Sequence, residues 1–418
     1  MREKADIDAM RRQNRLLVLG ALRQHSVMAR IEIGRLTGLS AATITSITAN
    51  LISEGILEEL NGRMEPSSPQ RRGRPLVQIG INPKAAHVVA VKISISGMEL
   101  ALADARGVIL SRHASRIATY DAMPRSFGTA VAGEIATFLS RSRVASRRVA
   151  RINVAVQGVA DSQAGTVIWS PAFRNRNIAV VEPIQHMLGI PCSVGNDANM
   201  IAEGMIGMDQ ERYGGTTAMV FLGYGVGMGL VIDGQVYHGP TGAAAEFGHM
   251  NHLPNGALCR CGRRGCVEAY AADYGILRLA KGEADTVPPT FDAVSEEDLL
   301  TLEARARAGD QHASTVYARA GEAIGFGLAR LIALLNPGRI VLAGPGTRAM
   351  DLIEPHIKTA IDDGVVDELR RNVEIEAAPI GTDMITKGTI DSALRQVDRE
   401  VFAQGAMTKF QLQLEEAG

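Results

Sequence analysis

Three cysteines and one histidine lie close together in the chain, in the pattern His-x9-Cys-x-Cys-x4-Cys formed by His249, Cys259, Cys261 and Cys266. Three thiolates and an imidazole make a closed tetrahedral shell for zinc, with no vacant position for a catalytic water. Gly262 and Gly265 allow the short loop to close around an ion. We therefore predict one structural zinc ion (Zn2+) per chain. The alternative is a turn that holds reduced cysteines.

Polar residues suited to a hydroxylated ligand flank this metal motif. Asn196 and Asp197 are adjacent, and Glu246 and Glu268 stand on either side of the cysteines. Carboxylates and amides hold sugar hydroxyls, because a hydroxyl both donates and accepts hydrogen bonds. Singly, such residues are more often helix caps or surface charges. Gathered around one metal loop, they predict a binding site.

Two glycine-rich stretches follow predicted strands. Residues 222–229 are LGYGVGMG, and residues 343–346 are AGPG. A loop of bare backbone can approach a phosphate or another ligand closely. Tight hairpins have the same composition, so these stretches are weak indications of a ligand site.

The elements that must position these residues follow an α/β plan, since strand and helix patterns alternate from about residue 84 onward. A second α/β section begins near Asn196. Strands are predicted at residues 88–95, 99–104, 108–110, 152–156, 217–222 and 339–343, helices at 130–139 and 318–335, and a loop at 281–295.

The N-terminal residues predict a helix-turn-helix. Helices are expected at 8–24 and 29–36, and Ser40 is placed to cap a third helix by accepting a backbone N–H bond. In that third helix, one buried face is formed by Ile44, Ile47, Thr48 and Leu51 at i, i+3, i+4 and i+7. Helix, glycine turn and capped helix is the pattern whose second helix lies in the DNA major groove.

Two strand-like runs, 56–60 and 76–81, bracket a basic loop that contains Arg71, Arg72 and Arg74. A hairpin behind the recognition helix predicts a winged helix-turn-helix in residues 1–82 that binds a double-stranded DNA operator. Its cationic tip would fit an A·T-rich minor groove. The alternative is a three-helix domain for protein contacts with solvated arginines. The recognition helix should read bases through methyl and hydroxyl groups, with contacts from Ser40, Ala41, Thr43, Thr45 and Ser46.

Composition sets outer limits on these interpretations. The 418 residues are 46% hydrophobic and 21% charged, which excludes wholesale disorder. Residues 1–82 carry 12 Lys and Arg against 8 Asp and Glu, whereas the remainder carries 32 against 37. A basic head on an acidic body agrees with a polyanionic partner for the head. We expect a cytoplasmic protein without a membrane anchor, because no long apolar run or signal peptide is evident.

The chain resembles the ROK family of sugar kinases and repressors. The resemblance rests on the first glycine run, on Glu-x-Gly-His at 246–249 and on Cys-x-Cys-Gly-x-x-Gly-Cys-x-Glu at 259–268. With the winged head it covers nearly the whole chain and is similar to the repressor branch, typified by xylose and N-acetylglucosamine regulators. It implies a two-lobed, actin-like (ribonuclease H-like) sugar-kinase fold: residues 83–195 with 385–418 as one lobe, and 196–384, with the zinc loop, as the other.

The same resemblance implies roles for individual residues. The hydroxyl-binding set would be Asn196, Asp197, Glu246, His249 and Glu268, with His249 also a zinc ligand. In the kinases, the acid that matches Asp197 is the base that activates the sugar hydroxyl.

Departures from the kinase pattern predict that the body is not an enzyme. Kinases of the family carry Asp-x-Gly-Gly-Thr on the first strand, where this chain has Lys92 and then Ser94, Ile95 and Ser96. Tyr224 and Met228 replace the Thr and Gly that are usual in the second phosphate loop. Both cradles for Mg-ATP are therefore altered.

The sequence thus predicts a DNA-binding regulator that acts as a repressor and is controlled by a sugar or sugar-phosphate effector. We expect it to act as a homodimer or higher homo-oligomer. The alternatives are an active ATP-dependent sugar kinase with a DNA-binding appendage, and a repressor controlled by a protein partner. The segment 169–177 is expected to help choose the sugar. Its two arginines, Arg174 and Arg176, are interpreted first as solvent-facing and second as anion-binding.

Overall fold

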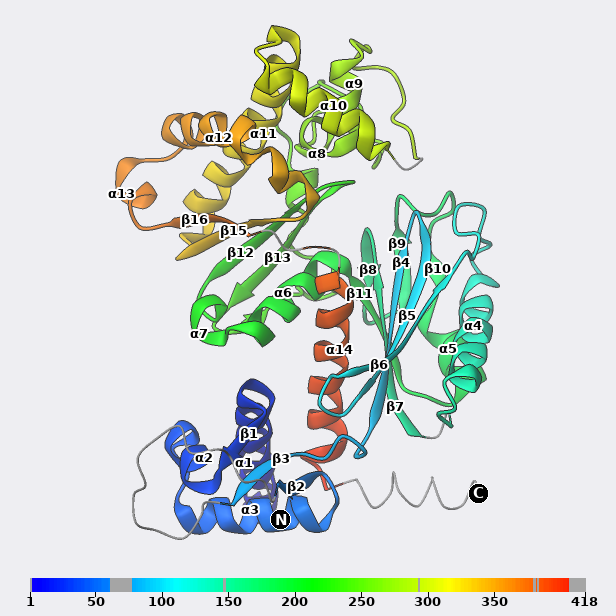
Figure 1. Cartoon of the computed structure of the whole chain (residues 1–418), viewed down its shortest axis with the longest axis vertical. Coiled ribbons are helices and arrows are strands. Elements are labelled where there is room, and N and C mark those ends of the chain that lie inside the picture. The colour runs from blue at the N-terminus through cyan, green and yellow to red at the C-terminus, as the bar shows by residue number, and fades with distance from the viewer. Residues whose placement is uncertain are drawn as a thin grey trace.

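The computed structural model describes residues 2–60, 77–145, 148–291, 294–378, 381 and 383–405, with side chains from residue 7 onward. The chain forms a small helical head and two α/β lobes, and the long helix α14 (Asp383–Val397) runs from the lobes toward the head (Figure 1). The predicted α/β class is confirmed.

The head contains the three predicted helices and a small antiparallel sheet in the order β1-β3-β2. Ser40 caps the third helix, because its side chain accepts a hydrogen bond from the Thr43 N–H. Ile44, Thr48 and Leu51 are buried, as the spacing predicted, and Gly38 makes the turn at a φ of 70°. The first helix is longer than predicted, and a short strand precedes the second. The elements are α1 (Arg2–His25), β1 (Val27–Ala29), α2 (Arg30–Thr37), α3 (Ala41–Ser53), β2 (Leu57–Leu60) and β3 (Gln78–Ile81).

The first lobe is built on a five-stranded sheet in the order β11-β7-β4-β5-β6. Alternate residues of β4 face opposite layers: Val89 and Val91 pack against α4 and α5, whereas Val88 and Ala90 pack toward α14. Small side chains on the second face let α14 approach the sheet. The elements are β4 (His87–Ser94), β5 (Gly97–Asp104), β6 (Ile109–Ser115), α4 (Phe127–Arg141), β7 (Val149–Val156), β8 (Val159–Asp161), β9 (Thr166–Trp169), β10 (Ile178–Ala179), α5 (Val181–Leu188) and β11 (Cys192–Asn196).

The second lobe has its own five-stranded sheet, in the order β14-β13-β12-β15-β16. Helices α8 to α12 cover one face, and α6 covers the other through Met200 and Met205. The elements are α6 (Asp197–Met208), α7 (Gln210–Tyr213), β12 (Thr217–Leu222), β13 (Val226–Ile232), β14 (Gln235–Val236), η2 (Phe247–His249), α8 (Glu268–Ala271), α9 (Asp273–Ala280), α10 (Glu296–Arg307), α11 (Gln311–Leu335), β15 (Arg339–Ala343), η3 (Pro345–Ala349), α12 (Met350–Gly364), α13 (Asp367–Arg370) and β16 (Glu374–Ala378).

The head and the first lobe share one hydrophobic core. Leu19 and Leu22 of α1 belong to the same buried cluster as Leu394 of α14 and Phe402 of the following turn, η4 (Asp398–Phe402). Arg15 donates to the Phe402 carbonyl at 3.0 Å through Nε. The head is therefore packed against the C-terminal part of the body. Within the described residues, the structure contains no helix that is both long and apolar enough to cross a membrane.

Candidate functional site

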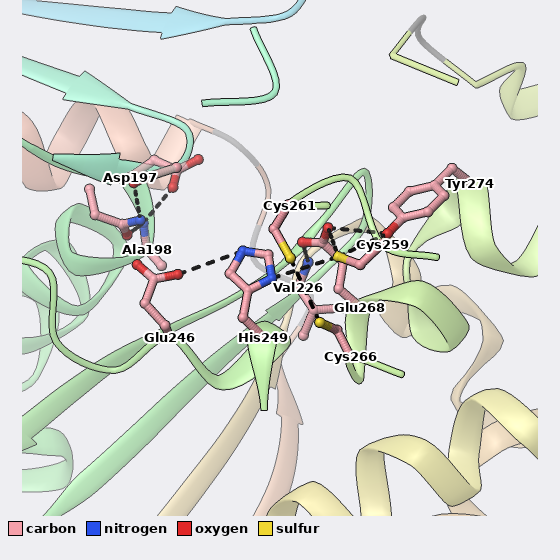
Figure 2. A network of polar contacts seen from close by, with 12 residues as sticks. Asp197, Ala198, Val226, Glu246, His249, Cys259, Cys261, Cys266, Glu268 and Tyr274 are labelled. Carbon is pink, nitrogen blue, oxygen red and sulfur yellow. Dashed lines mark hydrogen bonds and ion pairs between the residues drawn. The ribbon is translucent and has the colours of Figure 1, made fainter. Parts of the chain in front are cut away.

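The four predicted metal ligands converge at one point of the second lobe, beside the start of α8 (Figure 2). Their ligand atoms all lie within 4.8 Å of one another. Cys259 Sγ is 3.8 Å from His249 Nδ1, and Cys261 Sγ is 3.8 Å from Cys266 Sγ. A tetrahedron with metal–sulfur bonds of about 2.3 Å has edges of about 3.8 Å. The cluster therefore has the size of a metal shell.

Local chain geometry explains why this loop closes. Gly265 has a φ of 77°, and a Cβ there would lie 1.7 Å from the Leu253 carbonyl oxygen. The Tyr270 hydroxyl accepts a hydrogen bond from the Ala257 N–H at 2.9 Å, which ties the loop to α8. Hydrogen bonds among the three thiols lower the pKa of Cys261 and raise that of Cys259, so the sulfurs titrate as one coupled group.

A pocket opens beside the metal cluster, and all five predicted sugar-binding residues line it: Asn196, Asp197, Glu246, His249 and Glu268. The imidazole of His249 joins the two sites. Its Nδ1 faces the cysteines, whereas its Nε2 is 3.8 Å from Glu246 Oε2 on the pocket side. A metal on Nδ1 would fix the tautomer and present Nε2–H to the pocket.

Asn196 serves mainly as the N-cap of α6. Its Oδ1 accepts hydrogen bonds from the N–H groups of Ala198 and Asn199, at 2.7 and 3.3 Å, and its Nδ2 donates to the Gly158 carbonyl at 2.8 Å. These contacts use most of its polar capacity. Asn196 therefore positions Asp197 at the pocket and has little left for a ligand, which is the cap role that a single asparagine most often plays.

The two carboxylates on the open side of the pocket are hard to ionise. Burial raises the pKa of Asp197 to about 7, with a further contribution from Glu246. Burial also raises the pKa of Glu246, and the nearby His249 opposes that rise. Near neutral pH, Asp197 is therefore available both as a donor and as an acceptor.

Glu268 connects the metal loop with the glycine run. Its Oε2 accepts from the Val226 N–H at 3.2 Å, and its Oε1 accepts from the Tyr274 hydroxyl at 3.3 Å and lies 3.6 Å from Cys259 Sγ. The side chain lines the pocket and is buried. Glu268 therefore joins Cys259 to the backbone of β13.

Sequence reasoning missed several pocket residues. Gln157 and Gly158 line the pocket without having been predicted as ligand-binding, whereas Pro171 and Tyr224 line it from the stretches 169–177 and 222–229 that the sequence had already indicated. Trp169, the first residue of the segment expected to choose the sugar, also lines it, and its ring is 5.5 Å from the His249 ring, edge to face. A lone tryptophan at the start of that segment was a usable signal. No comparable signal marks Gln157, which reaches the site from the end of β7.

The family profile described as the ROK family matches residues 88–395. The chain belongs to the ROK family. It is 26% identical over 376 residues to the DNA-binding transcriptional dual regulator NagC of Escherichia coli K12, covering 88% of this chain and 89% of NagC. It is 25% identical over 393 residues to the repressor Mlc of the same organism, covering 93% of each.

Two solved ROK structures frame the fold. A ROK family transcriptional regulator described as a homologue of E. coli Mlc superposes with a TM-score of 0.74 at 24% identity, covering 96% of this chain and 98% of that one. A ROK glucokinase from Streptomyces griseus, solved with glucose and AMPPNP, has a TM-score of 0.57 at 25% identity and covers 74% of this chain and 99% of its own. The ROK kinase thus covers about three quarters of this chain, whereas the ROK regulator covers nearly all of it.

The residues that replace the ROK kinase motifs have structural partners here. Lys92 Nζ is 3.1 Å from Glu99 Oε1 on the neighbouring strand. The guanidinium of Arg260 lies 3.8 Å from the Tyr224 ring centre and 4.1 Å from that of Tyr274, and the Tyr224 hydroxyl donates to the Phe291 carbonyl at 2.9 Å. Met228 is buried in the core of the second lobe.

Packing requires at least one glycine in each glycine run of this ROK chain. A Cβ on Gly229 would lie 2.6 Å from the Ala198 carbonyl oxygen, so glycine lets β13 approach α6. A Cβ on Gly344 would lie 2.4 Å from the Leu222 carbonyl oxygen. Close approach therefore accounts for glycine at these two positions.

The predicted DNA contacts lie on the outward face of α3. Ser40, Ala41, Thr45 and Ser46 are exposed, and Thr43 is half-buried beside them. Asn50 is exposed on the same helix and was not counted among the base-reading candidates, although an amide can pair with adenine. The three wing arginines, Arg71, Arg72 and Arg74, lie outside the described residues.

Arg174 and Arg176 are both exposed. Neither lines the pocket, which agrees with the preferred solvent-facing interpretation.

Proposed function

We propose that this ROK protein is a DNA-binding transcriptional regulator, acting as a repressor, whose body binds a sugar or sugar derivative that alters operator affinity. Support for DNA binding comes from the capped, outward-facing α3 and from relatives named as DNA-binding regulators and repressors. Support for the effector comes from the pocket beside the metal cluster, where Asp197, Glu246 and His249 face one space.

The observation that carries the proposal is the common core of head and body. Leu19 and Leu22 of the head are buried together with Leu394 and Phe402 of the body. Because interiors are close-packed, a shift of α14 must move the head or open that core. A ligand that changes the relation between the lobes can therefore reach the DNA-binding helix.

We further propose the three-part division of residues 1–82, residues 83–195 with 385–418, and residues 196–384. The first five-stranded sheet falls within 87–196 and the second within 217–378, which supports it. In this division α6 stands between the lobes, since it packs on both α14 and β13. Its N-terminus carries Asp197, so a ligand there would contact the helix that packs on both lobes.

Zinc is the metal that best suits the cluster of His249, Cys259, Cys261 and Cys266, because soft thiolates with one imidazole in tetrahedral array favour it. The ion would hold the loop in shape and would supply no reaction step. With the loop held in this way, His249 Nε2 and Glu268 would be positioned for hydroxyl binding. Operator recognition by two heads would require a homodimer, by the usual half-site logic.

The test is fluorescence anisotropy of the full chain on labelled DNA from upstream of its own gene, titrated with hexoses, pentoses, amino sugars and their phosphates. The result expected is tight binding that one ligand abolishes. A ligand with 100-fold preference for the non-operator geometry supplies about 2.7 kcal/mol. Binding that ignores every ligand would instead favour control by a protein partner, and no binding at moderate salt would contradict the DNA-binding assignment.

One observation favours the kinase as a second candidate: the pKa of Asp197 is about 7, which suits a general base. Coupled detection of ADP with the same sugar panel separates the two. No turnover is expected, since Lys92 stands where the kinases carry an acid. Turnover above that of an Asp197→Ala control would overturn the regulator-only assignment.

A further inference from the structure

A second polar cavity lies between the lobes, against a different face of α6 from the sugar pocket. Asp197 and Ile201 of α6 line the sugar pocket, whereas Met200 and Glu203 line this second cavity. No residue lines both. The cavity has a volume of about 250 Å³, near the lower end of small-molecule sites, which begins at about 300 Å³. It is called the basal pocket below.

The walls of the basal pocket come from both lobes. Ser193 of β11 and Arg395 of α14 face Glu203 of α6 and the loop after β14. That loop is held in place, because the Ser162 N–H donates to the Thr241 carbonyl at 2.8 Å. The pocket is therefore a formed cavity whose occupant would touch α6 and α14 together.

The charges that face the basal pocket are unbalanced. Arg395 makes a hydrogen-bonded ion pair with Glu203, and the exposed Arg399 adds a second cation at the rim. His238 Nε2 is 3.7 Å from Glu203 Oε1, but burial lowers the pKa of His238, so the imidazole is neutral near pH 7. Two guanidinium groups are thus opposed by one carboxylate.

The positive charge of Arg395 has one direct carboxylate partner among the described residues, Glu203. Burial, followed by repulsion from Arg399 and Arg23, lowers the pKa of Arg395 to about 10. Asp398, the next acid along the chain, already has both carboxylate oxygens bound by Arg23. A further anion beside Arg395 would therefore be stabilised electrostatically.

Neutral polar groups line the sheet side of the same cavity. Ser193 Oγ is 2.8 Å from Asn153 Oδ1 and 3.4 Å from Gln396 Oε1, and Ser392 is also buried there. Hydroxyl and amide groups of this kind can exchange their mutual hydrogen bonds for bonds to a ligand's hydroxyls.

We propose that the basal pocket is a second ligand site, which binds a small organic anion carrying hydroxyl groups. Its phosphate or carboxylate would pair with Arg395 and Arg399, whose planar forks suit both groups. Its hydroxyls would contact Ser193 and Ser392. Because the walls belong to both lobes, the ligand would hold α14 against α6.

The test is isothermal titration calorimetry of the full chain with glycerol 3-phosphate, gluconate and inorganic phosphate. Glu203→Gln with Arg395→Gln removes the central charges together and leaves no buried charge unpaired, and Arg399→Ala removes only the exposed rim charge. Arg141→Ala, an exposed arginine on α4, is the matched control. Asp197→Asn changes the sugar pocket and no residue of the basal pocket, so it separates the two sites.

The result expected is binding of glycerol 3-phosphate or gluconate that weakens at least about tenfold in the double variant and severalfold in Arg399→Ala. Arg141→Ala and Asp197→Asn should leave that affinity unchanged. Whichever of the two probes binds assigns the phosphate or the carboxylate class. No binding of either at millimolar concentration, or loss of binding in Asp197→Asn with the Arg399→Ala affinity unchanged, would overturn the proposal. Inorganic phosphate binding as tightly as either probe would overturn the hydroxyl contacts.

Discussion

Arg23 of the head donates two hydrogen bonds to Asp398 of the body, from Nε to Oδ2 and from Nη2 to Oδ1, each 2.8 Å long. The side chains are only 17% and 6% exposed. Two residues that are far apart in the sequence thus form a buried ion pair at the junction between the head and α14. This ion pair and the shared apolar core hold the head against the C-terminal part of the body.

Breaking that pair should loosen the head. Asp398→Ala leaves the Arg23 guanidinium buried without its partner, so we expect the free energy of unfolding in urea to fall by about 3–5 kcal/mol. The matched control is Asp383→Ala, which removes the exposed partner of Arg112 and should cost less than about 1 kcal/mol. Equal losses in both variants would contradict a special role for the buried pair.

Loss of one metal ligand should empty the cluster and disorder its loop. Cys261→Ser removes a thiolate, and we expect the bound zinc measured by mass spectrometry to fall from about one per chain to near zero. Cleavage by trypsin after Arg263 or Arg264 should accelerate, since the metal fixes that loop. Cys192→Ser, which alters the buried cysteine of β11, should retain the metal. Full zinc content in Cys261→Ser would contradict the assignment.

The raised pKa of Asp197, about 7, makes ligand binding depend on pH. If the carboxylate accepts a sugar hydroxyl, affinity should rise about tenfold between pH 6 and 8, as the ionised fraction rises from about a tenth to about nine tenths. Fluorescence of Trp169, the single tryptophan and a pocket residue, reports the binding. Asp197→Asn should bind without this pH dependence, and a slope that survives the substitution would assign it to another group.

The raised pKa of Asp197 also makes the free energy of unfolding depend on pH. The pKa of Asp197 is higher in the folded chain than its ordinary value of 3.8. Its contribution to stability is therefore fully present below about pH 4 and is lost as the pH rises through about 7. In Asp197→Asn, the unfolding midpoint in urea should lose this component of its pH dependence. A midpoint with an unchanged pH profile would contradict the shifted pKa.

The wing arginines should contribute to DNA affinity mainly through phosphates and the minor groove. Replacing Arg72 and Arg74 together by alanine should reduce the slope of log affinity against log salt by about 2, because each phosphate contact contributes about 0.9. Thr45→Ala on α3 is the comparison, since it removes a hydroxyl and no charge. An unchanged slope in the arginine variant would contradict the assignment of these arginines to a DNA-binding wing.

The sequence by itself determined the parts of this protein that depend on near neighbours. The cysteine spacing predicted the cluster of four candidate metal ligands, and the cap at Ser40 with its 3-4 periodicity predicted α3, because such contacts form between near neighbours in the chain. The alternation of strands and helices predicted the fold class for the same reason. The five pocket residues were also named from the sequence, as the hydroxyl-binding set that the resemblance to the ROK family implies.

Only the tertiary structure showed which contacts those residues make with one another and with the rest of the chain. Asn196 is a cap that positions Asp197, Glu268 ties the metal loop to Val226, and the glycines of β13 are required by α6. The docking of the head on Asp398 and the basal pocket also lie beyond sequence reasoning. Each depends on side chains that are distant in sequence and meet only after the sheets and α14 have packed, and no local pattern records such a meeting.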